Sequence, residues 1–207
     1  SSKPMLKALI IDRGCIPIDL RTVPDDLERI KSSIAQGLKM VDIVLTTGGT
    51  SLGEKDLVPE AVSELGKPGV VVHGVSMRPA KPTGVGFIDG KPIFMLSGYP
   101  VAALVGFEVF VDPAINHILG SPPEARPVVR ARLSRKVATP VGVRSYLRVR
   151  LLRGRDGYIA EPLRLTGSGI LSSMTKANGI LVIKEHLEGY DEGEEVEVTV
   201  IQPIDGV

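Results

Sequence analysis

Apolar side chains recur along the first part of the chain with two different periods. Helical spacing of apolar residues after Asp25 predicts a helix that begins there, with Glu28 completing a capping box. Residues 41–46 form instead a short β-branched run, which is typical of a buried strand in a parallel sheet. The same reasoning predicts helices over residues 3–13, 58–65 and 100–119, strands over 15–20 and 70–73, and an Asp-Gly hairpin over 88–94. Because helix and strand alternate, we predict that residues 1–120 form a three-layer α/β domain with a mostly parallel sheet.

The pattern changes after residue 120. Glycine and prolines break it, and residues 121–126 are predicted to be a linker. Alternating apolar and polar residues then predict strands over 128–138, 145–153, 158–162 and 196–200, with one short helix over 170–176. Residues 127–207 are therefore predicted to form a small, mostly β domain that is barrel-like.

Composition and charge argue against several classes of partner. The 207 residues include 25 basic and 24 acidic side chains, for a net charge of +1, so we expect no nucleic acid and no membrane as a partner. Aromatic residues make up 4% with no Trp, which argues against a stacking surface for single-stranded nucleic acid. Cys15 is the single cysteine, so neither an intrachain disulfide nor a cysteine-rich zinc site is expected, and a cytoplasmic location fits. The histidines lack metal-ligand spacing and are predicted to be structural or surface residues: His73, His117 and His186.

The strongest candidate for chemistry is a glycine-rich loop at residues 46–56, which leads from a predicted strand into a helix. Open α/β sheets bind ligands at that edge, and glycines let backbone N–H groups come close to an anion. Asp56 is placed to hold a metal ion or to position a nucleophile. The loop has neither the Walker ending nor the Rossmann spacing, and a glycine-rich turn without function is the simpler alternative. The candidate ligand contacts are Thr47, Gly48, Gly49, Thr50, Ser51 and Gly53.

Two further motifs follow predicted strands of the same sheet. Basic residues among prolines at 77–84 suit a phosphate or another oxyanion, and residues 96–100 open a helix whose N-terminus favours anions. Each motif alone has a simpler interpretation, as exposed basic residues in a stiff loop or as an ordinary βα turn. Together the three motifs predict one pocket for a negatively charged ligand along one edge of the sheet. The added candidates are Arg78, Lys81, Ser97, Gly98 and Pro100.

These motifs resemble those of the molybdopterin molybdotransferases, a family of MoeA-like proteins that includes the E domain of gephyrin. The run TGGTSLGEKD at residues 47–56 resembles the family's TSGGxSxGxxD loop, and MRPAKP at 77–82 resembles its MKPGKP segment. The run LSGYPVA at 96–102 resembles LPGNPVS, and GSGILSSM at 167–174 fits the family's β-rich tail. The match spans essentially the whole chain, with the motifs in order.

The resemblance implies a MogA-like α/β molybdopterin-binding domain followed by a small β-barrel domain. It implies a reaction in which adenylylated molybdopterin and molybdate, or tungstate, give the metal cofactor and AMP. It also implies Mg²⁺ and a homodimer whose clefts join two subunits. The family pattern assigns Asp56 to the metal or molybdate, Arg78 and Lys81 to an oxyanion or phosphate, and the other candidates to the pocket around the pterin phosphate.

The chain departs from the family pattern within these motifs and at its start. Arg78 stands where the family usually has Lys, which keeps the charge and alters the geometry. Ser97 and Tyr99 replace the first Pro and the Asn of LPGNP, which changes the shape of the pocket. The resemblance further implies that the chain corresponds to the C-terminal portion of a family member, without the N-terminal domains and the first strand with its terminal Asp. Weaker ligand binding or inactivity is the expectation for such a portion.

Other interpretations stay open on the sequence alone. The run TTGGT at residues 46–50 also resembles the loop of the MogA-like adenylyltransferases, which activate molybdopterin with ATP. Ser51, where those enzymes have Gly, and the β-rich tail favour the molybdotransferase. A non-catalytic module for molybdopterin binding or dimerisation is a further interpretation.

Overall fold

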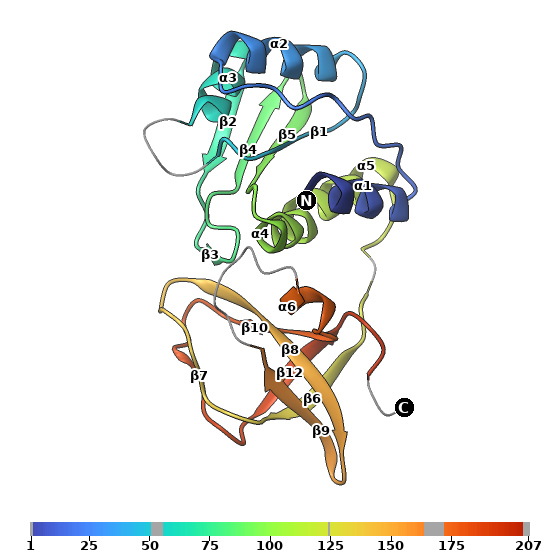
Figure 1. The fold of residues 1–207 in the computed structure, drawn as a ribbon, viewed down its shortest axis with the longest axis vertical. Coiled ribbons are helices and arrows are strands. Elements are labelled where there is room, and N and C mark those ends of the chain that lie inside the picture. The colour runs from blue at the N-terminus through green and yellow to red at the C-terminus, as the bar shows by residue number, and fades with distance from the viewer. Residues whose placement is uncertain (1, 51–55, 124, 164–171, 205–207) are drawn as a thin grey trace. The chain divides into compact units, whose positions relative to one another are not determined.

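The computed structural model describes residues 2–50, 56–123, 125–163 and 172–204. The chain divides into two compact units (Figure 1). Unit 1 comprises Ser1–Val75 and Ala80–Pro122, and unit 2 comprises Ser76–Pro79 and Pro123–Val207. The sequence placed residues 76–79 in the first domain. The structure assigns them to unit 2 because Met77–Arg78 forms a short strand, β3, that pairs in parallel with a strand of that unit.

Unit 1 is built around a four-stranded sheet in the order β1-β5-β4-β2. Strands β1 and β5 are parallel, and β4 is antiparallel to both β5 and β2, so β1, β5 and β2 run in one direction and β4 makes the sheet mixed rather than mostly parallel. Helices α2 and α3 cover one face of the sheet, and α1, α4 and α5 cover the other (Figure 1). This arrangement confirms the predicted three-layer α/β fold. The elements are α1 (Ser2–Asp12), α2 (Leu27–Leu38), β1 (Val44–Thr47), α3 (Leu57–Leu65), β2 (Pro68–His73), β4 (Gly84–Ile88), β5 (Lys91–Leu96), α4 (Pro100–Gly106), the π-helical turn η1 (Phe107–Val111) and α5 (Asp112–Leu119).

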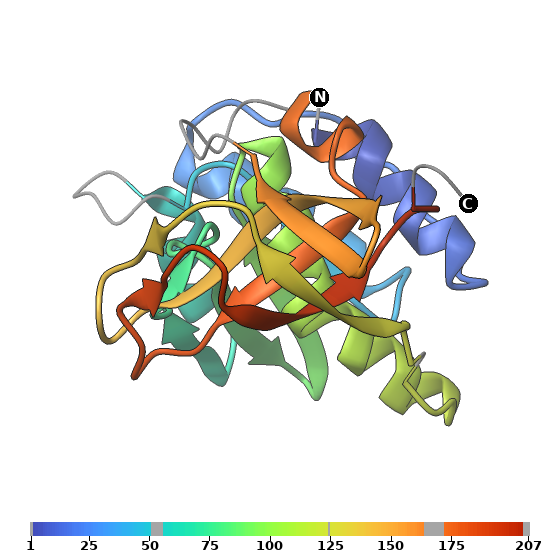
Figure 2. The ribbon, with the colours of Figure 1, turned by 90° about the horizontal axis from the view of Figure 1, so that it is seen from below.

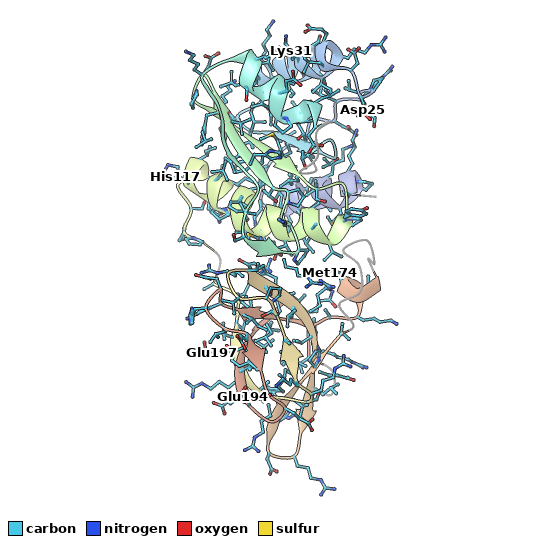
Figure 3. All side chains as sticks on the ribbon, turned by 90° about the vertical axis from the view of Figure 1, so that its left-hand side faces the viewer. Asp25, Lys31, His117, Met174, Glu194 and Glu197 are labelled. Atoms are coloured by element: carbon cyan, nitrogen blue, oxygen red, sulfur yellow. The ribbon has the colours of Figure 1, made fainter. Side chains whose placement is uncertain are left out.

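Helix α2 shows how local sequence sets an element in unit 1. Its N-cap is Asp26 rather than the predicted Asp25, because the Asp26 carboxylate accepts a hydrogen bond from the Arg29 backbone N–H at 2.9 Å. The helix buries the apolar stripe that predicted it. Lys31, which is labelled in Figure 3, forms ion pairs at 2.9 Å with Glu28 and with Glu64 of α3, so the two helices are also joined by charged side chains.

The strand predicted over residues 15–20 is wrong. The segment has no regular secondary structure and no sheet partner among the described residues, and Ile16 is 88% exposed. Pro17 lacks the N–H that a strand pairing would need. Asp19 instead forms ion pairs with Lys3 at 2.8 Å and Lys7 at 2.7 Å, which tie the segment to α1.

The long apolar helix predicted over residues 100–119 forms as α4, η1 and α5 in succession. In the π-helical turn the Asp112 N–H donates to the Phe107 carbonyl, and the proline that follows has no N–H with which to continue a regular ladder. By length and composition alone, Pro100–Leu119 would also be able to cross a membrane. Here it packs as a core helix, because Phe107 and Val111 are fully buried against the sheet side of unit 1.

Unit 2 is a small β-barrel. Its strands follow the order β10-β12-β6-β9-β8, and a further pairing of β10 with β8 closes this five-stranded barrel, as predicted (Figure 2). Strand β10 was not predicted, because its apolar run does not alternate with polar residues. The single strand predicted over residues 128–138 forms as two strands, β6 and β7. The described part of the predicted helix over residues 170–176 is α6. The elements are β6 (Val128–Leu133), β7 (Val137–Ala138), β8 (Arg144–Gly154), β9 (Gly157–Pro162), α6 (Ser172–Thr175), β10 (Gly179–Ile183), β11 (Gly189–Tyr190) and β12 (Glu195–Val200).

A buried amide in unit 2 bonds to the backbone of β8. The Asn178 side chain donates to the Leu151 carbonyl at 3.0 Å and accepts from the Leu151 N–H at 2.6 Å. Asn178→Ala would leave both backbone groups buried without these partners, so we expect a loss of about 2–4 kcal/mol in the stability of unit 2. Thermal and urea unfolding followed by circular dichroism would measure this loss. Gln202→Ala, which truncates an exposed amide, serves as the control and should change stability by less than about 0.5 kcal/mol.

Candidate functional site

Three turns leave the sheet of unit 1 at the same edge. Strands β1 and β5 are parallel, and their last residues, Thr47 and Leu96, are paired. The end of β2 pairs with Gly84 at the start of β4, and Gly84 pairs with Met95 of β5. The turns after β1 and β5 therefore start side by side, and the turn after β2 starts one strand further along the same carboxyl edge, where α/β sheets bind ligands.

The turn after β1 and the turn after β5 are in direct contact. Gly48 and Gly49 have φ angles of 82° and 64°, a conformation that favours glycine. The Gly48 N–H donates to the Leu96 carbonyl at 3.1 Å, and a Cβ atom placed on Gly98 would lie 3.5 Å from the Gly48 Cα. Thr50 is 1% exposed, and its hydroxyl donates to the same Leu96 carbonyl at 3.4 Å. The two turns thus form one surface of closely spaced backbone groups.

The turn after β5 is fixed on several sides. Ser97 is buried, and its Oγ accepts a hydrogen bond from the Tyr99 N–H at 3.2 Å. The Gly98 carbonyl accepts from the Ser2 hydroxyl of α1 at 2.7 Å. Pro100 is the first residue of α4, where its missing N–H costs nothing. The continuous helix α4-η1-α5 therefore starts at this edge, with the dipole orientation that favours an anion.

The turn after β2 carries a cation at the same edge. The Val75 N–H donates to the Lys81 carbonyl at 2.9 Å, and the Thr83 hydroxyl donates to the Ala80 carbonyl at 2.8 Å. Lys81 itself is exposed. Arg78, predicted to act with Lys81, is exposed on β3 and belongs to unit 2.

Asp56 occupies the N-cap position of α3, and its carboxylate accepts no capping hydrogen bond from the helix. Ser51 and Gly53 lie outside the described residues. Among the residues that the structure describes, no group of three or more His, Cys, Asp or Glu side chains could hold a metal ion. A single carboxylate nevertheless suits Mg²⁺, which proteins often hold with one or two carboxylates together with substrate phosphates.

Unit 2 contains a buried cation that sequence reasoning missed. Leu147, Val149 and Leu151 of β8 point into the barrel core, so Arg148 lies on the opposite face of the strand. Arg148 is nevertheless only 4% exposed, and its Nε has no hydrogen-bond partner in the described part of the chain. Burial lowers the pKa of the Arg148 guanidinium. A desolvated cation of this kind suits an anionic ligand.

Comparison with known proteins places both units in one family. Residues 1–117 match the family described as probable molybdopterin binding domain, and residues 130–201 match the MoeA C-terminal region (domain IV). The chain belongs to the MoeA-like molybdopterin molybdotransferases.

Individual relatives of this MoeA-like chain agree. It is 30% identical over 206 residues to a molybdopterin molybdenumtransferase of Bacillus subtilis, covering 100% of this chain and 48% of the relative. It is 41% identical over 202 residues to a protein of Methanocaldococcus jannaschii named for molybdopterin biosynthesis, covering 98% and 47%. The solved structure of a molybdopterin biosynthesis MoeA protein from a Pyrococcus species has a TM-score of 0.78 at 36% identity, covering 95% and 46%. The chain therefore spans about half the length of these relatives.

The MoeA-like fold accounts for what the sequence could and could not indicate about the site. The glycine turns were predictable because glycine and small residues follow apolar strands. The burial of Arg148 was not predictable, because the alternation of apolar and polar residues around it is that of an ordinary strand with Arg148 facing outward. His117, predicted to be a structural or surface residue, is exposed on α5 (Figure 3).

Proposed function

We propose that this MoeA-like protein inserts molybdate, or tungstate, into adenylylated molybdopterin and releases AMP. The observation that carries the proposal is the contact between the Gly48 and Gly98 turns at the carboxyl edge of the sheet. It brings the backbones of two glycine turns together within the region that matches a molybdopterin-binding family. The match of unit 2 to the MoeA C-terminal region supports the molybdotransferase over a MogA-like adenylyltransferase.

In this proposal the chain's own groups bind and polarise the phosphates. Backbone N–H groups of the glycine turns and the α4 N-terminus hold the pterin phosphate and its adenylate. In the proposed step a water oxygen attacks the pterin phosphorus, and the bond between that phosphorus and the AMP oxygen breaks. The protons of the water pass to solvent, AMP leaves with the electron pair, and the Lys81 ammonium stabilises the charge that it carries. Asp56 would hold Mg²⁺ against the phosphates, where the ion would neutralise charge.

The assembly and location of the protein are part of the same proposal. We expect a homodimer with a cleft that joins two subunits, and a cytoplasmic protein, because the resemblance to the MoeA-like family implies the first and the single cysteine fits the second. Size-exclusion chromatography with light scattering would measure the oligomeric state. A monomer at micromolar concentration would contradict the dimer.

The function is tested by incubating the protein with adenylylated molybdopterin and measuring AMP with and without molybdate. Release of AMP that depends on molybdate, or on tungstate in a parallel reaction, is the expected result. ATP-dependent adenylylation of molybdopterin would instead identify a MogA-like activity. Ligand binding without either reaction would identify a non-catalytic module and overturn the proposal.

A further inference from the structure

Tyr99 differs from every other aromatic residue of the chain. The chain has four phenylalanines and four tyrosines, and all of them lie in the described residues. Tyr99 is 62% exposed, whereas the other seven are buried or half-buried. An aromatic ring that stays in water does not make the large contribution to folding stability that its burial would make.

The backbone that carries this ring is held in place. The Tyr99 N–H donates to the Ser97 hydroxyl, and the Tyr99 carbonyl accepts from the Ala103 N–H at 2.9 Å in the first turn of α4. The preceding residue, Gly98, is bonded through its carbonyl to Ser2 and approaches Gly48. The exposed ring is therefore presented by a fixed turn, directly beside the glycine surface that we assign to phosphate.

We propose that Tyr99 recognises the ligand's ring: its phenol face stacks on a planar nitrogen heterocycle attached to the phosphate that the glycine turns bind. The inference rests on the proposed function, which supplies a ligand with two such rings, pterin and adenine. An aromatic side chain offers a face to either ring at little entropic cost, since it has only two side-chain torsions to fix. The asparagine that the resemblance places at this position offers hydrogen bonds but no such face.

The proposal predicts a selective loss of affinity. Isothermal titration calorimetry would compare Tyr99→Leu and Tyr99→Phe with the unaltered protein. The ligands are AMP, neopterin monophosphate and ribose 5-phosphate, the last of which has a phosphate but no ring. We expect Tyr99→Leu to weaken the stacked ligand by about tenfold, Tyr99→Phe to stay within about threefold, and ribose 5-phosphate to bind all three proteins alike. If the affinity for AMP falls, the stacking partner is adenine, and if the affinity for neopterin monophosphate falls, it is the pterin.

The outcomes separate this inference from the proposed function. If the protein binds AMP and neopterin monophosphate no more weakly after Tyr99→Leu, stacking by Tyr99 is overturned and the phosphate site stands. If the unaltered protein binds none of the three ligands, the phosphate site and the ring contact both fail. An equal loss of affinity for all three ligands after Tyr99→Leu, ribose 5-phosphate included, would show that the substitution disturbs the turn. That result would overturn ring recognition.

Discussion

An Asp56→Ala variant is expected to lose molybdate-dependent AMP release by at least about a hundredfold while keeping its fold. Asp56 lies at the start of α3, next to the edge where β1 and β5 end. Its carboxylate makes no capping hydrogen bond to α3, and the favourable charge that its removal takes from the helix N-terminus is worth about 0.3–1 kcal/mol. A large loss of turnover with a small loss of stability would mark Asp56 as a group that acts on the ligand or its metal ion.

The matched control is Glu60→Ala, which removes an exposed carboxylate from the first turn of the same helix. Glu60→Ala should leave AMP release within about twofold, because an exposed charge is screened by solvent. Asp56→Asn should resemble Asp56→Ala, since an amide keeps the shape and removes the charge that a Mg²⁺ ion needs. Normal AMP release by both Asp56 variants would remove this residue from the mechanism.

An Arg148→Met variant should separate function from stability in unit 2. Arg148 is buried, and its Nε has no hydrogen-bond partner in the residues that the structure describes. Replacing a desolvated cation with an apolar side chain of similar length is often neutral or stabilising, so the unfolding free energy should stay within about 1 kcal/mol or rise. Molybdate-dependent AMP release should fall by about tenfold or more, because the anionic ligand that we expect at Arg148 of unit 2 loses its charged partner.

Arg153→Met provides the comparison, since Arg153 is an exposed arginine on the same strand, β8. It should change neither stability, beyond about 0.5 kcal/mol, nor AMP release. Both quantities are measured on the same preparations, by chemical unfolding and by the AMP assay. An Arg148→Met variant that unfolds easily yet releases AMP normally would show that the guanidinium holds the barrel together and binds no ligand.

Elements determined by neighbouring residues were predictable from the sequence. The hairpin between β4 and β5 is one case: Asp89 and Gly90 both have positive φ, at 51° and 77°, as a tight hairpin turn requires. The buried strand β1 is another, because a short β-branched run fits a parallel sheet and little else. In each case the signal lies within a few residues of the element itself.

Elements determined by distant pairing were not predictable. The two-residue strand β3 exists because Met77 and Arg78 pair with Arg144 and Ser145, far along the chain. The strand expected over residues 15–20 does not form for the opposite reason, because no neighbouring strand pairs with this segment in the described structure. A local pattern states what a segment is able to form, and only the rest of the fold decides whether a partner is present.

The candidate site divides in the same way. The meeting of Gly48 with Gly98 follows from one rule about strand ends, so the sequence could predict it. The exposure of Tyr99 and the burial of Arg148 depend on how much space the surrounding elements leave. Neither residue differs in its local pattern from an ordinary surface or core position.

The most direct test of the phosphate site is an amide chemical-shift titration of the ¹⁵N-labelled protein with AMP. We predict saturable shifts at Gly48, Gly49 and Gly98 together, with one common dissociation constant. A cleft of about 460 Å³ between residues 19–24 and α2 is the competing location. Shifts confined to that cleft, with the glycine amides unmoved, would contradict the account.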